Sequence, residues 1–240
     1  DLFKNNTRQF LFNTEEYLYL VDTKGSPVGN YPIRLPAAAT NGISVFDFDK
    51  NKDFKIYIAC SNRQIYAYQP SGKPLPGWNF LNALDLVVDP IRSVTVNGKD
   101  ILLITDRAGT VAFANRFGEQ GIQVSKEFAR ARNSGIFKTK SGSLLTTDAS
   151  GSIIEIDPDG SVQTTSLNSS SAGHGFLYAD ADGNKEPDYI FLDLNMPRMN
   201  GIECLREIKT LPHLKKTIVI MYSTTDENDV RELTKGLGAD

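Results

Sequence analysis

Several features that define common enzyme and secreted-protein classes are scarce in this 240-residue chain. Only two cysteines are present, Cys60 and Cys204, and their wide separation argues against a disulfide framework. The two histidines, His174 and His213, have no evident nucleophile partner, so no Ser-His-Asp or Cys-His catalytic set is indicated. An enzymatic role is therefore not predicted.

Long apolar runs and an excess of basic charge are missing as well. No stretch of 18 or more apolar residues occurs, so neither a membrane-spanning helix nor a membrane partner is predicted. A net charge of −3 with 23% charged residues gives no global positive field to attract nucleic acid. The chain is long enough for one large or two modest domains.

A strand-like signature that ends in glycine recurs four times in the first part of the chain. It reads LYLVDTKG, IYAYQPSG, VAFANRFG and IIEIDPDG, and it ends at Gly25, Gly72, Gly118 and Gly160. These glycines are 47, 46 and 42 residues apart. Glycine accommodates the positive φ that a tight turn after a strand requires. A period in the forties indicates stacked supersecondary units.

Further strand-like segments precede these signatures. Before the last three lie Phe54–Cys60, Asp100–Thr105 and Ser143–Thr147, and a third segment opens each of these units at Gly42, Arg92 and Ser134. The links between paired segments, SNRQ, DRAGT and DASGS, have the length and composition of hairpin loops. The pattern predicts a mostly β module over residues 1–186, with about four repeat units and the start of a fifth.

In rhythm, these units resemble the blades of PQQ-type, WD-type and FG-GAP-type β-propellers, although no full consensus sequence of those families is present. The resemblance implies a non-enzymatic binding or scaffold module. A propeller-type enzyme and an irregular β-sandwich are the alternatives, and the regular glycine spacing favours blades. The fifth unit, which begins at HGFLYADADGN, lacks its strand pair, so the propeller is expected to be incomplete.

Two acidic loops carry oxygen-bearing side chains at alternate positions. The first contains Asp47, Asp49, Asn51 and Asp53, and the second contains Asp180, Asp182 and Asn184. Such spacing lets a loop curl around a hard cation, so both loops are candidate Ca²⁺ sites. The alternative is a hairpin loop that Asx turns close without a metal.

The periodicity changes to a helical one after Pro187. Ile202, Leu205 and Ile208 form an apolar stripe, and Asn200 is a suitable N-cap. The apolar run of residues 217–222 is typical of a strand in a parallel sheet, and a second helical pattern follows it. The predicted order is β-α-β-α over residues 187–240, a partial α/β segment.

The sequence FLDLNMPRMNG, residues 191–201, resembles the phosphoacceptor loop of bacterial response-regulator receiver domains, which have a doubly wound, flavodoxin-like fold. The resemblance implies that Asp193 is phosphorylated, that the Asn195 carbonyl binds Mg²⁺, and that Ser223 contacts the phosphoryl group. It also implies a histidine kinase as partner. Receivers carry an acidic pair after their first strand and a lysine after their fifth. Neither has a clear counterpart here, so the receiver-like segment is predicted to be chemically incomplete.

The segment PDYIFLD fits both a propeller strand and the receiver's phosphoacceptor strand, so the two patterns join between about Pro187 and Leu194. A chimeric or truncated chain is the simplest interpretation. The leading hypothesis is a non-enzymatic propeller-type scaffold joined to an incomplete receiver fragment. The alternative is a two-component response regulator in a phosphorelay, phosphorylated on Asp193. Self-association through exposed sheet edges is expected, and both a cytoplasmic and an exported location remain open.

Overall fold

The computed structural model describes residues 2–3, 6–80, 82–166, 189–193, 201–210, 217–222 and 236. The chain forms two compact units, residues 1–123 and 124–240, and each is considered by itself. The boundary predicted after residue 186 falls inside the second unit and outside the described residues. Over the described ranges, no helix has both the length and the apolar character needed to cross a membrane.

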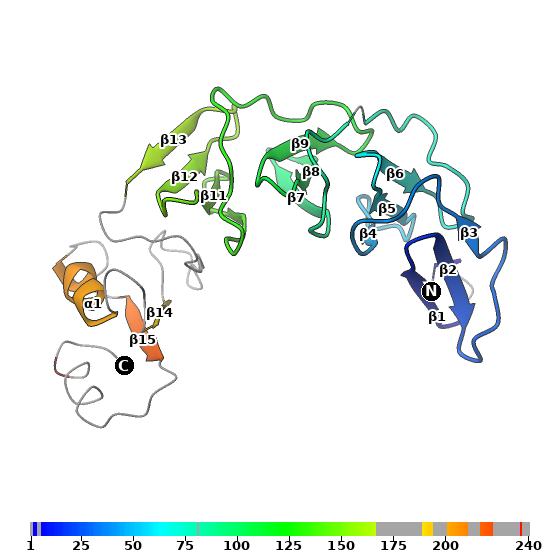
Figure 1. Ribbon diagram of the computed structural model, residues 1–240, viewed down its shortest axis with the longest axis horizontal. Helices are drawn as coiled ribbons and strands as arrows, with labels where there is room; N and C mark the ends of the chain where they lie inside the picture. The colour runs from blue at the N-terminus through cyan, green and yellow to red at the C-terminus, as the bar shows by residue number, and fades with distance from the viewer. Residues whose placement is uncertain are drawn as a thin grey trace. The chain divides into compact units, whose positions relative to one another are not determined.

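Antiparallel three-stranded sheets build the described part of the first unit (Figure 1). The first sheet comprises β1 (Gln9–Asn13), β2 (Tyr17–Asp22) and β3 (Ile33–Arg34); the second comprises β4 (Ser44–Phe46), β5 (Lys55–Ala59) and β6 (Ile65–Tyr68); the third comprises β7 (Arg92–Val96), β8 (Lys99–Thr105) and β9 (Val111–Asn115). The strands predicted in the second and third sheets are confirmed, as is β2. The structure adds β1 and β3, which the repeat signature does not contain.

The second unit contains a four-stranded antiparallel sheet and a separate parallel pair. The fourth sheet runs in the order β10 (Phe137–Lys138), β11 (Leu144–Thr147), β12 (Ile153–Ile156) and β13 (Val162–Thr165). The parallel pair is β14 (Tyr189–Asp193) with β15 (Ile218–Tyr222), and α1 (Gly201–Thr210) lies between them in sequence. The predicted fold class, mostly β repeats followed by a partial α/β segment, is confirmed.

The repeat glycines close one recurring turn. After β2, the N–H of Gly25 donates to the carbonyl oxygen of Asp22, and the N–H of Asp22 donates to the carbonyl oxygen of Ser26. The same pair of hydrogen bonds recurs at Gly72, Gly118 and Gly160. The four glycines have φ values of 82°, 81°, 84° and 93°. The predicted positive φ is therefore confirmed at every repeat of the signature.

The first and second sheets pack face to face. Leu18 and Leu20 of β2 lie in one core with Ile56 and Ile58 of β5, and all four side chains are almost completely buried. Side chains alternate between the two faces of a strand, so these residues use only one face of β5.

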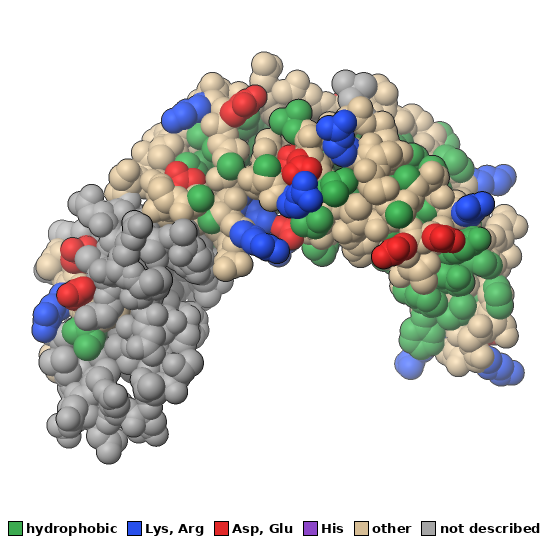
Figure 2. Space-filling view, in the orientation of Figure 1, with side chains coloured by type: hydrophobic (Ala, Val, Ile, Leu, Met, Phe, Trp, Pro, Cys, Tyr) green, Lys and Arg blue, Asp and Glu red, His purple; other side chains and the backbone are tan. Residues whose placement is uncertain are grey.

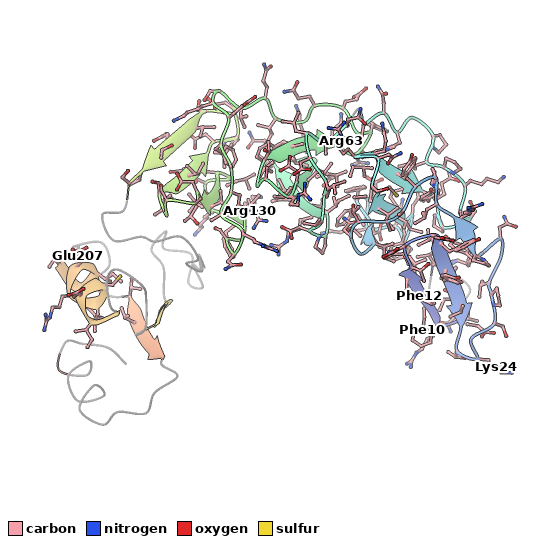
Figure 3. All side chains as sticks on the ribbon, in the orientation of Figure 1. Phe10, Phe12, Lys24, Arg63, Arg130 and Glu207 are labelled. Carbon is pink, nitrogen blue, oxygen red and sulfur yellow. The ribbon has the colours of Figure 1, made fainter. Side chains whose placement is uncertain are left out.

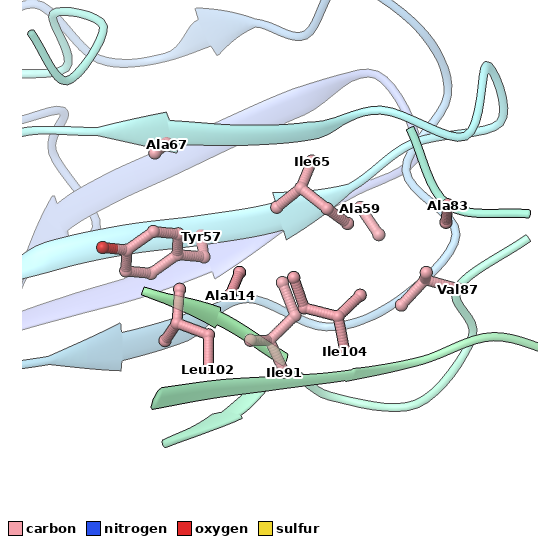
Figure 4. Close-up of a cluster of buried hydrophobic side chains, with 10 residues drawn as sticks. All are labelled: Tyr57, Ala59, Ile65, Ala67, Ala83, Val87, Ile91, Leu102, Ile104 and Ala114. Carbon is pink, nitrogen blue, oxygen red and sulfur yellow. The ribbon is translucent and has the colours of Figure 1, made fainter. Parts of the chain in front are cut away.

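The opposite face of β5 builds a second core with the third sheet. Tyr57 and Ala59 lie there with Leu102 and Ile104 of β8, and Figure 4 shows the Tyr57 ring beside Leu102. The Trp78 indole N–H donates to the carbonyl oxygen of Ile65 at 2.7 Å, which satisfies its polar group at the side of this core. The second sheet is thus covered on both faces, as a propeller blade is and as a sheet of a two-layer sandwich is not.

Replacing Gly118 with alanine is expected to destabilise the protein more than the same change at Gly25. Both positions have positive φ, where a Cβ costs about 1–2 kcal/mol. At Gly118 a Cβ would also lie 2.6 Å from the backbone nitrogen of Phe80, whereas nothing lies within 4 Å at Gly25. We expect Gly118→Ala to lose a further ~1–3 kcal/mol in urea unfolding, and equal losses would contradict this close approach.

Candidate functional site

The parallel pair places Asp193 at the carboxyl end of β14. The strands are in register, with Tyr189 opposite Ile218 and Asp193 opposite Tyr222. Parallel strands end at the same edge of a sheet, so Asp193 and the end of β15 share one edge, and Ser223 is the next residue in the chain. In open α/β sheets, ligands bind at this edge. The backbone therefore meets the first requirement of the receiver resemblance.

The helix between these strands is tied to both of them. α1 contacts β14, and its central residue Leu205 is fully buried, while Ile202 and Ile208 are half-buried. The Lys209 ammonium donates to the carbonyl oxygen of Thr217 at 3.5 Å, immediately before β15. The apolar stripe predicted from the sequence is confirmed, and α1 ends two residues before Pro212.

Much of the predicted receiver machinery lies outside the described residues. This applies to Asn195, Ser223 and the second acidic loop with Asp180, Asp182 and Asn184. The second predicted helix also lies there, apart from Gly236, which is helical. The roles assigned to these residues stay predictions.

Neither cysteine has the lowered thiol pKa that is typical of a nucleophile. Burial raises the pKa of Cys60 to about 11, against a smaller opposing contribution from the backbone amide of Ala37. Burial, and then the negative charge of Glu207, raises the pKa of Cys204. The thiolate is the reactive form, so both groups remain unreactive thiols near neutral pH.

The first acidic loop is closed by its own side chains. The Asp47 carboxylate accepts the N–H of Asn51 at 3.1 Å and the N–H of Lys52 at 2.8 Å. The Asn51 side-chain oxygen accepts the N–H of Asp53 at 2.8 Å. Lys50 and Lys52 adopt positive φ within this turn. These contacts are the Asx-type closure that was the alternative to a metal site.

The remaining carboxylates of that loop face cations of the protein. Asp53 pairs with Lys55 at 2.7 Å, and Asp49 pairs with Arg116 at 3.0 Å. Within the described ranges, no group of three or more His, Cys, Asp or Glu side chains is arranged to hold a metal. Calcium binding at this loop stays a prediction, and a cation at Asp49 would compete with Arg116.

Arg116 is a contact between sheets that sequence reasoning did not identify. Its guanidinium binds Asp49, which follows β4, and also Asp100 of β8 at 2.8 Å, and it covers the Phe48 ring at 5.4 Å. The hydrogen bond to Asp49, followed by the attraction of both carboxylates, raises the pKa of Arg116. Arg116 thus joins the second and third sheets. One feature of the sequence could have indicated Arg116. It is the sixth residue of the third repeat signature, and the other three signatures have threonine or proline at that position.

Aspartates elsewhere in the repeats also serve turns. The Asp22 carboxylate accepts the N–H groups of Lys24 and Ser26 at 2.8 and 2.9 Å, and the bond from Ser26 contributes most to lowering the pKa of Asp22. Burial alone would raise the pKa of Asp148, but hydrogen bonds from Ser150 and Ser152 outweigh it and lower the pKa. These carboxylates are used to hold the backbone and do not converge on a common site.

Replacing Asp47 with alanine is expected to destabilise the first unit without any metal present. The change removes two hydrogen bonds from backbone amides to a carboxylate, which corresponds to about 1–2 kcal/mol in a chelator-containing buffer. Asp53→Ala is the matched control, because it removes only a partly exposed ion pair and should cost less than about 1 kcal/mol. Repeating the thermal unfolding with Ca²⁺ tests the calcium prediction. If the loop binds Ca²⁺, the Tm of the unsubstituted chain should rise with Ca²⁺, and Asp47→Ala and Asp53→Ala should each reduce this rise.

Comparison with protein families supports the receiver resemblance for the end of the chain. The family model for the response regulator receiver domain matches residues 163–240, about a third of the chain. The match begins within β13 and includes β14, α1 and β15. Response regulator Rcp1 from Synechocystis sp. (strain ATCC 27184 / PCC 6803 / Kazusa) is 40% identical over 48 residues. Those residues are 20% of this chain and 33% of Rcp1, so the match spans a third of that relative.

Solved structures share only low sequence identity with the chain. BBS1N, crystallised in complex with ARL6DN, has a TM-score of 0.47 at 12% identity over 67% of this chain and 50% of its own. BamB from Moraxella catarrhalis has a TM-score of 0.45 at 12% identity over 68% of this chain and 49% of its own. The chain therefore spans about half of each of these structures. By the family match, residues 163–240 carry a receiver-domain sequence.

Proposed function

We propose that the chain is a non-enzymatic binding scaffold of propeller-type sheets, joined to a receiver-type segment that is chemically incomplete. The observation that carries this proposal is the double coverage of the second sheet. Ile56 and Ile58 are fully buried on one face of β5, and Tyr57 and Ala59 on the other. A sheet held in this way is a rigid support, and its connecting loops are free to recognise partners.

The use of polar groups supports a scaffold over a catalyst. Asp22, Asp47 and Asp148 bind backbone amides, and Asp49 pairs with Arg116. Catalytic acids and bases instead converge on a cleft, where burial and neighbouring charges adjust their pKa values. Across the part of the chain that the structure describes, the aspartates with lowered pKa values lie in turns or ion pairs.

A second candidate function is phosphoryl acceptance by Asp193. The register of Asp193 with Tyr222 and the receiver family match favour it. In this reaction a carboxylate oxygen of Asp193 would bond to phosphorus while the bond from phosphorus to the donor's leaving atom breaks, an imidazole nitrogen in a phosphohistidine or an acetate oxygen in acetyl phosphate. Mg²⁺ would help to neutralise the charge that develops on the phosphoryl group, and a histidine kinase would be the natural donor.

Incubation with acetyl phosphate and Mg²⁺ distinguishes the two functions. The scaffold proposal expects no mass increase of one phosphoryl group on the intact chain. An increase that disappears in Asp193→Asn would overturn the proposal and establish the second candidate. Asp159→Asn is the control, because Asp159 is a turn aspartate whose carboxylate accepts the Ser161 N–H, and this substitution should leave the mass spectrum unchanged.

Limited proteolysis of the full chain tests the rigidity that a scaffold needs. We expect a resistant product that retains all residues from β1 to β9, because both cores of the first unit lie within it. Ile58→Ala should expose this product to cleavage, since emptying a fully buried site costs about 2–5 kcal/mol. Val45→Ala, at a side chain 38% exposed, should not. Early cleavage inside the product of the unsubstituted chain argues against the proposal.

A further inference from the structure

The repeat signature makes positions in different sheets equivalent. In every sheet of the first unit, the second and fourth residues of the signature each form a cross-strand pair with one residue of the preceding strand. These cross-strand pairs are Tyr19 with Phe12 and Val21 with Phe10; Tyr66 with Ile58 and Tyr68 with Ile56; and Ala112 with Ile104 and Ala114 with Leu102. Phe10 and Phe12 of the first sheet are therefore equivalent to Ile56 and Ile58 of the second sheet.

In the second and third sheets these positions face the preceding sheet and are covered by it. Ile56 and Ile58 are 0% exposed against the first sheet. Leu102 and Ile104, in the third sheet, are 0% and 1% exposed and lie in the core shared with the second sheet. The repeat thus uses this face to receive another sheet.

In the first sheet no described strand or helix is packed on the same face. Phe10 is 58% exposed and Phe12 is 44% exposed, and Figure 3 shows both along β1. The Phe12 ring stacks on Tyr19 at 5.1 Å, and Tyr17 lies 6.0 Å from Tyr19. Figure 2 shows hydrophobic side chains gathered over this sheet. We call Phe10, Phe12, Tyr17, Tyr19 and Val21 the aromatic face; its opposite side, with Leu18 and Leu20, already covers the second sheet.

Opposite charges lie at the two ends of the aromatic face. Arg8 precedes β1, and Glu15 and Glu16 follow it in the turn to β2; all three are exposed. Arg34 of β3, opposite Tyr17, is also exposed at the Glu15 end and leaves that end with one net negative charge. A two-fold axis that lies in the plane of contact, above the middle of β1 and perpendicular to the strand, would place Arg8 of each copy near Glu15 and Glu16 of its partner. Such a surface is self-complementary in charge as well as apolar at its centre, which is the requirement of an isologous dimer.

We propose that the aromatic face docks against the same face of a second copy of this chain. The second copy takes the place that a preceding sheet occupies at the second and third sheets. Phe10 and Phe12 form the centre of the contact, because large aromatic rings contribute most to such interfaces, and the charged pairs at its ends set the antiparallel orientation.

Sedimentation of the full chain over a range of concentrations tests this proposal. A concentration-dependent dimer is expected, and Phe10→Lys with Phe12→Lys should raise its dissociation constant by about tenfold or more. Both side chains are exposed in one copy, so the variant should keep its Tm at dilutions where the chain is monomeric. Phe117→Lys, at another ring that is 50% exposed, is the control and should leave the dissociation constant unchanged.

A charge reversal distinguishes this dimer from association by general stickiness. Arg8→Glu should weaken the dimer, and adding Glu15→Arg and Glu16→Arg should restore it, because each copy then again meets opposite charge. A monomer at all concentrations would overturn the proposal. So would a dimer that Phe10→Lys with Phe12→Lys leaves intact, or one that the triple charge reversal fails to restore.

Discussion

The strict alternation of side chains along β5 is the constraint on which the first unit depends. Ile56 and Ile58 enter one core, and Tyr57 and Ala59 enter the other, so a single five-residue strand holds three sheets together. A shift of one residue in its pairing with β4 or β6 would exchange the two sets. Ile56 and Ile58 would then enter the core that holds Tyr57, and Tyr57 would enter the core that holds the two isoleucines. The register of this strand is therefore fixed from both sides.

The turns protect that register by a second, local device. Each signature strand ends in a glycine turn, and Asp22 and Asn115 add side-chain hydrogen bonds to backbone amides of two of these turns. Asp148 does the same in the hairpin loop between β11 and β12. Hairpin turns set the pairing of the strands they join, so a carboxylate that holds a turn also holds the packing of the sheet behind it. This explains how so many aspartates can be present without forming an acidic site in the described ranges.

The sequence was most informative where a local pattern repeats. The glycine signature predicted β6, β9 and β12, the strand-like segments and hairpin links before it predicted their partners, and the apolar stripe of α1 followed from helical spacing alone. The strand QFLFN of β1 lacks a glycine turn signature and was missed. The ion pair between Arg116 and Asp49 joins residues 67 positions apart, so it depends on how the sheets stack. No short sequence pattern indicates it. At the candidate phosphoacceptor, the sequence indicated both the strand that ends at Asp193 and the strand of residues 217–222, and the structure supplied their parallel register.

The fourth sheet differs from the first two at one position of the signature, and the difference bears on how copies of the chain can assemble. The third residue of the signature is Leu20 in β2 and Ala67 in β6, and both pack against the following sheet. In β12 the same position holds Glu155, opposite Leu145 and Gln163. Covering a carboxylate with an apolar sheet is costly unless a cation accompanies it. Head-to-tail stacking of one chain's aromatic face on this position of the next is thereby disfavoured, so the proposed association favours a closed pair over a filament.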